Sequence, residues 1–126
     1  MSTRNADIHR KTGETDVTVS VGIDGTGVSE VDTGIGFFDH MLSAFVKHAW
    51  IDLNLRCEGD LQVDFHHSVE DCGIVLGSAI KEAIYPAQNI ERFGDSVVVM
   101  DEAAVSAALD FSNRAFLVFD CPSLKR

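Results

Sequence analysis

The segment GFFDHMLSAFVKHAWIDLNLRC, residues 36–57, changes its hydrophobic period partway along and decides how helix and strand alternate in the chain. In its first half the apolar residues recur every three or four positions, which is typical of one face of a helix. In its second half apolar and polar residues alternate, which is typical of a half-buried strand. We therefore predict a helix over residues 37–48, and one or two strands within residues 51–65 with a turn at 58–60.

The chain before this segment has the pattern of a β-hairpin. TDVTVSVGID, residues 15–24, places an aliphatic residue at every second position, which predicts a strand. DGTG, residues 24–27, predicts a hairpin turn, and a shorter strand is expected around Val28 and Val31. The glycines of TGIG, residues 33–36, are expected to end that strand.

The chain after the segment predicts a second helix and then further strands. The helix is expected to begin at about His66 and to end before Pro86, since proline disfavours a helical residue in front of it. Beyond Arg92, strands are expected from Val97, Val105 and Phe116 onward. The expected order is therefore strands, helix, strand, helix and again strands.

A short similarity links the two strand-rich parts. VSVGID at 19–24 and VSAALD at 105–110 share Val, Ser, an aliphatic residue and Asp in register. An internal repeat and a chance agreement are both compatible with so short a match. If the repeat is real, the second copy of His67 would fall beyond residue 126.

Composition narrows the class of protein. A chain of 126 residues is long enough for one domain, and no apolar run approaches the ~20 residues of a membrane span. Residues 1–16 are polar and do not resemble a secretory signal, so we expect a cytoplasmic protein. The net charge of −10 disfavours nucleic acid and anionic membranes as partners. The spacing of Cys57, Cys72 and Cys121 predicts reduced thiols rather than disulfides or a cysteine zinc site.

DFHHSVEDCG, residues 64–73, offers two histidines and two carboxylates within one or two helical turns. On a helix His66 would face Glu70, while His67 would face Asp71 and lie within reach of Glu70. Successive imidazoles diverge by about 100°, which favours ligands of two different centres over one shared ion. Imidazole with carboxylate suits Zn, Mn, Fe or Ni. The alternative is a solvated helix start, where acidic residues favour the positive end of the helix dipole.

Other candidate residues are individually ambiguous. His40 follows Asp39, which can accept an imidazole N–H and fix the tautomer of a ligand, but a satisfied core histidine fits the same pattern. Glu14 precedes the first expected strand, where it is a candidate general base or an ordinary exposed carboxylate. Arg92 and Arg114 are candidate phosphate ligands or surface cations. The remaining candidates are expected at the surface, in packing or in a turn: His9, His48 and MDEA at 100–103.

Five motifs in this order resemble the imidazoleglycerol-phosphate dehydratase family of histidine biosynthesis. The motifs are GFFDHML at 36–42, DFHHSVEDCGIVLG at 64–77, ERFG at 91–94, MDEA at 100–103 and DFSNR at 110–114. The resemblance implies an α+β fold, with one dehydratase domain over residues 1–126. It implies a two-layer sheet-and-helix half-domain (ribosomal S5 domain 2-like), complete over about 10–90, with a second repeat opening over about 91–120.

The resemblance also implies a site and an assembly. Family members form a 24-subunit homo-oligomer with two Mn²⁺ sites shared between subunits. By motif, His40, His67 and Glu70 match ligands of one ion and His66 a ligand of the other. Glu14 matches the catalytic, substrate-contacting glutamate. Phosphate binding is implied for Arg92 and Arg114, and contact with the substrate also for the four metal ligands.

The implied reaction is the removal of water from imidazole glycerol phosphate to give imidazole acetol phosphate. The carbon that loses the proton is not acidic. Metal ions that bind the imidazole can supply charge stabilisation, and a carboxylate base can then take the proton. The second half of the family pattern, with its own HHxxE, is absent from these 126 residues. We therefore expect the isolated chain to be inactive or nearly so. The alternative is a catalytically incomplete half-domain that binds metal or self-associates.

Overall fold

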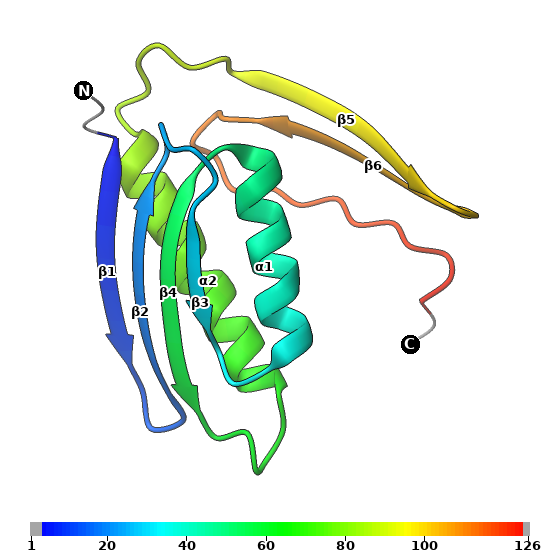
Figure 1. Ribbon diagram of the computed structural model, residues 1–126. Coiled ribbons are helices and arrows are strands. Elements are labelled where there is room, and N and C mark those ends of the chain that lie inside the picture. The colour runs from blue at the N-terminus through cyan, green and yellow to red at the C-terminus, as the bar shows by residue number, and fades with distance from the viewer. Residues whose placement is uncertain (1–3, 125–126) are drawn as a thin grey trace. The chain divides into compact units, whose positions relative to one another are not determined.

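The computed structural model describes residues 4–124, which divide into two compact units on either side of the Gln88–Asn89 bond. Figure 1 shows the elements in chain order. The first unit contains β1 (Asn5–Lys11), β2 (Thr15–Gly22), β3 (Ser29–Asp32), α1 (Gly36–Ala49), β4 (Asp52–Gly59) and α2 (His66–Ile84). The second contains β5 (Phe93–Met100) and β6 (Ala103–Asp110).

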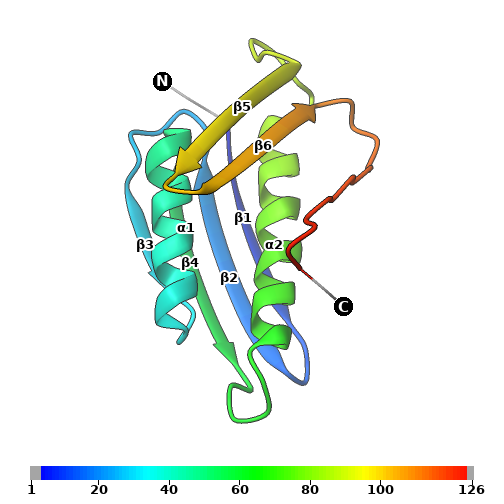
Figure 2. The ribbon, with the colours of Figure 1, turned by 90° about the vertical axis from the view of Figure 1, so that its right-hand side faces the viewer.

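The first unit is a two-layer α+β structure. Its sheet has the order β1-β2-β4-β3, with β2 antiparallel to both β1 and β4, and β3 parallel to β4. Both helices cover the same face of the sheet, as Figure 2 shows with the sheet behind them. The expected α+β class and both expected helices are confirmed. Among residues 4–124, neither helix combines the length and apolar character needed to span a membrane.

The core forms where the alternating strands meet the two helices. Every second residue of β2 and β4 points to the helices, and each of these apolar residues is at least nine-tenths buried: Val17, Val19, Val21, Leu53, Leu55 and Cys57. Helix α1 contributes Leu42 and Val46, and α2 contributes Cys72, Val75, Ala79 and Ala83. The period-2 and helical patterns of the sequence therefore meet in one core.

The three cysteines are free, as expected, and burial beside Cys57 raises the pKa of the Cys72 thiol.

The expected hairpin between residues 15 and 31 is wrong, because β3 pairs with β4 rather than with β2. The carboxylate of Asp52, at the start of β4, accepts the backbone N–H groups of Thr26 and Val28 at 3.0 Å each. The N–H of Leu53 then donates to the carbonyl oxygen of Val28 at 3.0 Å. These bonds hold the DGTG loop across the beginning of β4, so the chain enters the sheet on the far side of that strand.

The hairpin partner of β2 is β1, for which the sequence has little signal. This edge strand pairs with β2 from Asn5 opposite Gly22 to Lys11 opposite Asp16. Its inward-facing side chains include only two aliphatic ones, Ala6 and Ile8. A polar edge strand of this kind has too few apolar positions to produce a recognisable period.

The second unit is an antiparallel hairpin followed by irregular chain. MDEA, residues 100–103, makes the expected turn between β5 and β6, where Asp101 has a φ of 53°. The strand expected at Phe116 is wrong, since residues 115–121 have no regular structure. Every residue of β5 and β6 is exposed. That this unit opens a second repeat stays a prediction.

Two contacts fix the first turns of α2 against the sheet. The hydroxyl of Thr15 donates to Asp71 Oδ2 at 2.6 Å, and the Arg10 guanidinium lies 3.0 Å from Asp71 Oδ1. Asp71 is buried, and these two partners hold the pKa of its carboxyl below the usual range. At the end of β4, a Cβ atom on Gly59 would overlap the Ser68 hydroxyl, so only glycine permits this approach.

Replacing Leu55 with alanine tests the core. Leu55 is 1% exposed, so Leu55→Ala is expected to lower the free energy of unfolding by about 2–5 kcal/mol through lost burial and a residual cavity. Urea denaturation measures this loss. The matched variant Leu109→Ala, at a half-exposed position of β6, is expected to change it by less than about 0.5 kcal/mol. Equal losses in both variants would contradict the assigned core.

Replacing Asp71 with asparagine tests the anchor of α2. A carboxyl whose pKa is lowered on folding stabilises the folded state above its unfolded pKa of about 4, and this stabilisation is lost as pH falls through the folded pKa. Asp71→Asn is therefore expected to cost about 1.5–3 kcal/mol at pH 7, because charge-assisted hydrogen bonds are lost. The cost should disappear in acid.

The measurement is urea denaturation of both proteins from pH 7 down to acid pH. Asp95→Asn, in the exposed strand β5, is the control and should show no cost at either end. A cost for Asp71→Asn that does not depend on pH would show that the carboxylate charge of Asp71 does not contribute to the anchor.

Candidate functional site

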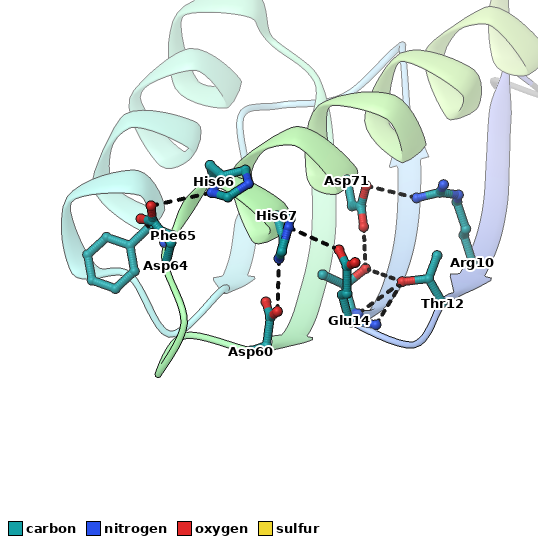
Figure 3. A network of polar contacts seen from close by, with 10 residues as sticks. Arg10, Thr12, Glu14, Asp60, Asp64, Phe65, His66, His67 and Asp71 are labelled. Atoms are coloured by element: carbon teal, nitrogen blue, oxygen red, sulfur yellow. Dashed lines mark hydrogen bonds and ion pairs between the residues drawn. The ribbon is translucent and has the colours of Figure 1, made fainter.

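Three segments of the first unit meet at one end of the sheet. They are the turn between β1 and β2, the loop between β4 and α2, and the first turn of α2 (Figure 3). In the turn, the Thr12 hydroxyl oxygen accepts the N–H groups of Glu14 and Thr15 at 3.1 Å each. The N–H of Asp60 donates to the carbonyl oxygen of Glu14 at 3.0 Å and joins the loop to the turn. A shallow depression of about 330 Å³ lies here, lined among others by Thr12, Glu14 and Asp60.

His67 lies between two carboxylates that come from these segments. Its Nδ1 is 2.8 Å from Asp60 Oδ2, and its Nε2 is 3.2 Å from Glu14 Oε2. The hydrogen bond to Asp60 is the largest cause and raises the pKa of His67. Burial lowers this pKa, and the charges of Asp60, Glu14 and Asp71 raise it. Within residues 4–124, only Glu14, Asp60 and His67 place three potential metal ligands within 4.8 Å of one another.

The carboxylates that contact His66 and His67 are not those three or four residues further along α2. His66 is exposed and its Nδ1 lies 3.4 Å from Asp64 Oδ2, while Asp71 turns inward to Thr15 instead of toward His67. The β4–α2 loop and the β1–β2 turn bring nearer carboxylates than the helix itself does. The two imidazoles contact different carboxylates, and their ring centroids are 4.1 Å apart.

The expected ligand set His40, His67 and Glu70 is not gathered within the described part of this one chain. His40 lies exposed on α1, and Glu70 lies exposed on α2. Asp39 does not serve as the expected partner of His40, because its carboxylate accepts the N–H of Thr33 at 2.9 Å and also the Thr33 hydroxyl. The set was expected to be shared between subunits, so it stays a prediction.

The two candidate phosphate ligands lie in the second unit. Arg92 forms a two-point contact with Asp110, with Nε 2.7 Å from Oδ1 and Nη2 3.2 Å from Oδ2, and its guanidinium lies 4.9 Å from the Phe93 ring centre. Arg114 and Asp110 both line a depression of about 740 Å³ in this unit. Arg92, and to a smaller extent Arg114, holds the pKa of Asp110 below its usual range.

Two carboxylates were missed by reasoning from the sequence. Asp60 was expected only as part of a turn, although it stands seven residues before His67, at the end of β4. Asp110 begins the quoted motif DFSNR, but its partner Arg92 stands 18 residues earlier, outside that motif. Neither contact follows from local spacing, because each joins residues on different elements.

Comparisons with known proteins identify the family of this chain. The family model described as imidazoleglycerol-phosphate dehydratase matches residues 33–126. The imidazoleglycerol-phosphate dehydratase of Campylobacter hominis is 71% identical over 116 residues, covering 92% of this chain and 61% of that protein. The one from Campylobacter fetus is 62% identical over 112 residues, covering 89% of this chain and 59% of the relative. The chain therefore spans about three fifths of the length of these relatives.

A solved structure supports the same relationship. The crystal structure of imidazoleglycerol-phosphate dehydratase from Staphylococcus aureus matches with a TM-score of 0.81 and 32% identity, over 97% of this chain and 66% of that one. The family model covers well over half of the sequence, and it includes the histidine pair and both candidate arginines. This chain belongs to the imidazoleglycerol-phosphate dehydratase family.

Proposed function

We propose that this chain takes part in the metal-dependent dehydration of imidazole glycerol phosphate to imidazole acetol phosphate, a lyase reaction of cytoplasmic histidine biosynthesis. Family membership supports the reaction class. The observation that carries the proposal is the position of Glu14, whose carboxylate lies 3.2 Å from Nε2 of His67. A potential general base thus stands beside a potential metal-ligand nitrogen, which is the pairing this elimination requires.

The donor atoms suit a transition metal ion. Imidazole with carboxylate is a ligand combination for Mn²⁺ and its neighbours, whereas Mg²⁺ and Ca²⁺ prefer oxygen alone. We assign His40, His67 and Glu70 to one Mn²⁺ ion and His66 to a second, with further ligands from other subunits of a homo-oligomer. His40, His66 and Glu70 are exposed and therefore accessible to a neighbouring subunit. The ions would supply positive charge that stabilises negative charge developing on the substrate.

Glu14 has the role of acid–base catalyst in this proposal. Its side chain is 54% exposed at the tip of the β1–β2 turn, so it can reach a substrate that lies over the depression. The carboxylate takes the proton from carbon, and the C–O bond of the neighbouring carbon breaks. The departing hydroxide accepts that proton from the Glu14 carboxyl and leaves as water, and the resulting enol rearranges to the ketone product. Arg92 and Arg114 would hold the phosphate, which would then compete with the Asp110 carboxylate for these guanidinium groups.

The exposed apolar surface of the second unit favours one alternative function, that of a catalytically incomplete half-domain. Between 65% and 90% of each of these side chains is exposed: Val97, Val98, Val99, Met100, Phe116 and Phe119. Exposed apolar groups at this density are typical of surfaces that another protein covers. A catalytically incomplete half-domain that binds metal or self-associates would have the same surface.

Replacing Glu14 tests the proposed chemistry. The test uses a fusion protein. In it, this chain replaces the region of the Campylobacter hominis relative with which it aligns, and the rest of that relative is kept. In that protein, Glu14→Gln is expected to lower kcat by about 10²–10⁴-fold, because the base is lost, while the Mn²⁺ content is unchanged. Glu82→Gln, on the exposed face of α2, is the control. Full activity of the Glu14→Gln protein would exclude Glu14 as the base.

Replacing Arg114 tests phosphate binding in the same fusion. Arg114→Gln is expected to raise KM about tenfold or more with a smaller effect on kcat, since a charge-assisted hydrogen bond to the phosphate is lost. Steady-state kinetics of the dehydration measure both constants. Arg56→Gln is the matched control because Arg56 is exposed on β4 and pairs with Glu58. An unchanged KM in Arg114→Gln would remove Arg114 from the phosphate site.

The 126-residue chain studied alone distinguishes the two candidate functions. Native mass, metal analysis and an assay with Mn²⁺ are the measurements. A manganese-loaded multi-subunit assembly with turnover supports the enzyme. Metal binding or self-association without turnover supports the incomplete half-domain.

A further inference from the structure

We infer that Asp60 is a positioning residue, which keeps the proton of neutral His67 on Nδ1 and thereby leaves the lone pair of Nε2 available to a metal ion. The part of this inference that concerns the ion rests on the proposed function. The part that concerns the tautomer of His67 stands on the geometry of the first unit alone.

Two carboxylates compete for the single N–H of neutral His67. The distance from Nδ1 to Asp60 Oδ2 is 2.8 Å, and the distance from Nε2 to Glu14 Oε2 is 3.2 Å. The Asp60 side chain is 16% exposed, while that of Glu14 is 54% exposed and better solvated. A charge-assisted hydrogen bond is stronger when it is shorter and less screened by water. The proton therefore stays on Nδ1, directed to Asp60.

The backbone fixes the position of the Asp60 carboxylate. The N–H of Asp60 donates to the carbonyl oxygen of Glu14 at 3.0 Å, and its own carbonyl oxygen accepts the N–H of Val63 at 2.8 Å. The Asp60 backbone is thus held on both sides in the loop that follows β4, and Figure 3 shows the Asp60 side chain beside His67. The same bond joins the backbone of Glu14, the proposed base, to that of Asp60.

The other carboxylate oxygen of Asp60 contributes no stabilising contact. Its Oδ1 is buried and has no hydrogen-bond partner in the described part of the chain. A buried acceptor without a partner lowers stability, so the carboxylate is not an optimal structural group at this position. We therefore expect variants of Asp60 to fold, which allows the effect on His67 to be measured directly.

The first measurement is the ¹⁵N chemical shift of both His67 ring nitrogens in the metal-free 126-residue chain, above the pH at which His67 titrates. In the unchanged protein Nδ1 should carry the proton and Nε2 should not. Asp60→Ala should shift the balance toward the Nε2–H form. Asp60→Asn keeps an oxygen that can accept the Nδ1–H, so it should retain much of the original tautomer.

The second measurement is the affinity for Mn²⁺, followed by the loss of the electron paramagnetic resonance signal of free Mn²⁺. Loss of a carboxylate that orients a ligating histidine typically costs 10–100-fold in metal affinity. Asp60→Ala is expected to fall in that range, with Asp60→Asn between it and the unchanged protein. The matched control is Asp16→Ala, because Asp16 Oδ1 lies 2.5 Å from Nε2 of His9 in a second histidine–carboxylate pair. It should alter neither the His67 shifts nor the affinity.

Two outcomes would overturn the inference. One is a His67 tautomer in Asp60→Ala that is the same as in the unchanged chain. The other is a changed tautomer with Mn²⁺ affinity unchanged in Asp60→Ala. If the unchanged chain binds no Mn²⁺, the metal part of the proposed function fails for this chain, and the nitrogen shifts still decide whether Asp60 positions His67.

Discussion

The rest of the site depends on one constraint, the fixed position of α2 against the sheet. Asp71 is buried between Thr15 of β2 and Arg10 of β1, so the helix cannot rotate without leaving a buried carboxylate unpaired. Glycine at position 59 lets the end of β4 approach Ser68 more closely than any side chain would allow. With the helix held in this way, His66 and His67 are directed to the edge where the loops meet.

The site is assembled by backbone hydrogen bonds between loops and only partly by helical spacing. The bond from the N–H of Asp60 to the carbonyl oxygen of Glu14 brings two carboxylates to opposite nitrogens of His67. An imidazole between two carboxylates attracts positive charge, whether a proton or a metal ion. In neutral His67 the inferred proton position is Nδ1, beside the nearer carboxylate of Asp60, so Nε2 is the nitrogen available to a metal ion.

The second unit has a different physical character from the first. The first unit has a closed core of alternating strand residues and helix residues, whereas every side chain of β5 and β6 is exposed. Arg92 is already paired with Asp110, and the charge of Arg114 also lowers the pKa of that carboxyl. In the proposed function, a phosphate group of the substrate would replace the Asp110 carboxylate and receive the same two-point contact from a guanidinium. About two fifths of the length of each relative lies outside the region that aligns with this chain.

The amino-acid sequence by itself determined those helices and strands whose hydrophobic pattern repeats within a few residues. It also determined the family to which the chain belongs. The stripes of residues 37–48 and the alternation of residues 15–24 were sufficient for α1 and β2, because each pattern repeats within a few residues. It also indicated Glu14 and His67 individually. The pairing of β3 with β4, the polar edge strand β1 and the contact of Asp60 with His67 were decided only in the tertiary structure. Each of these joins separate elements, and the geometry of the loops between them, not the spacing along the chain, determines which groups meet.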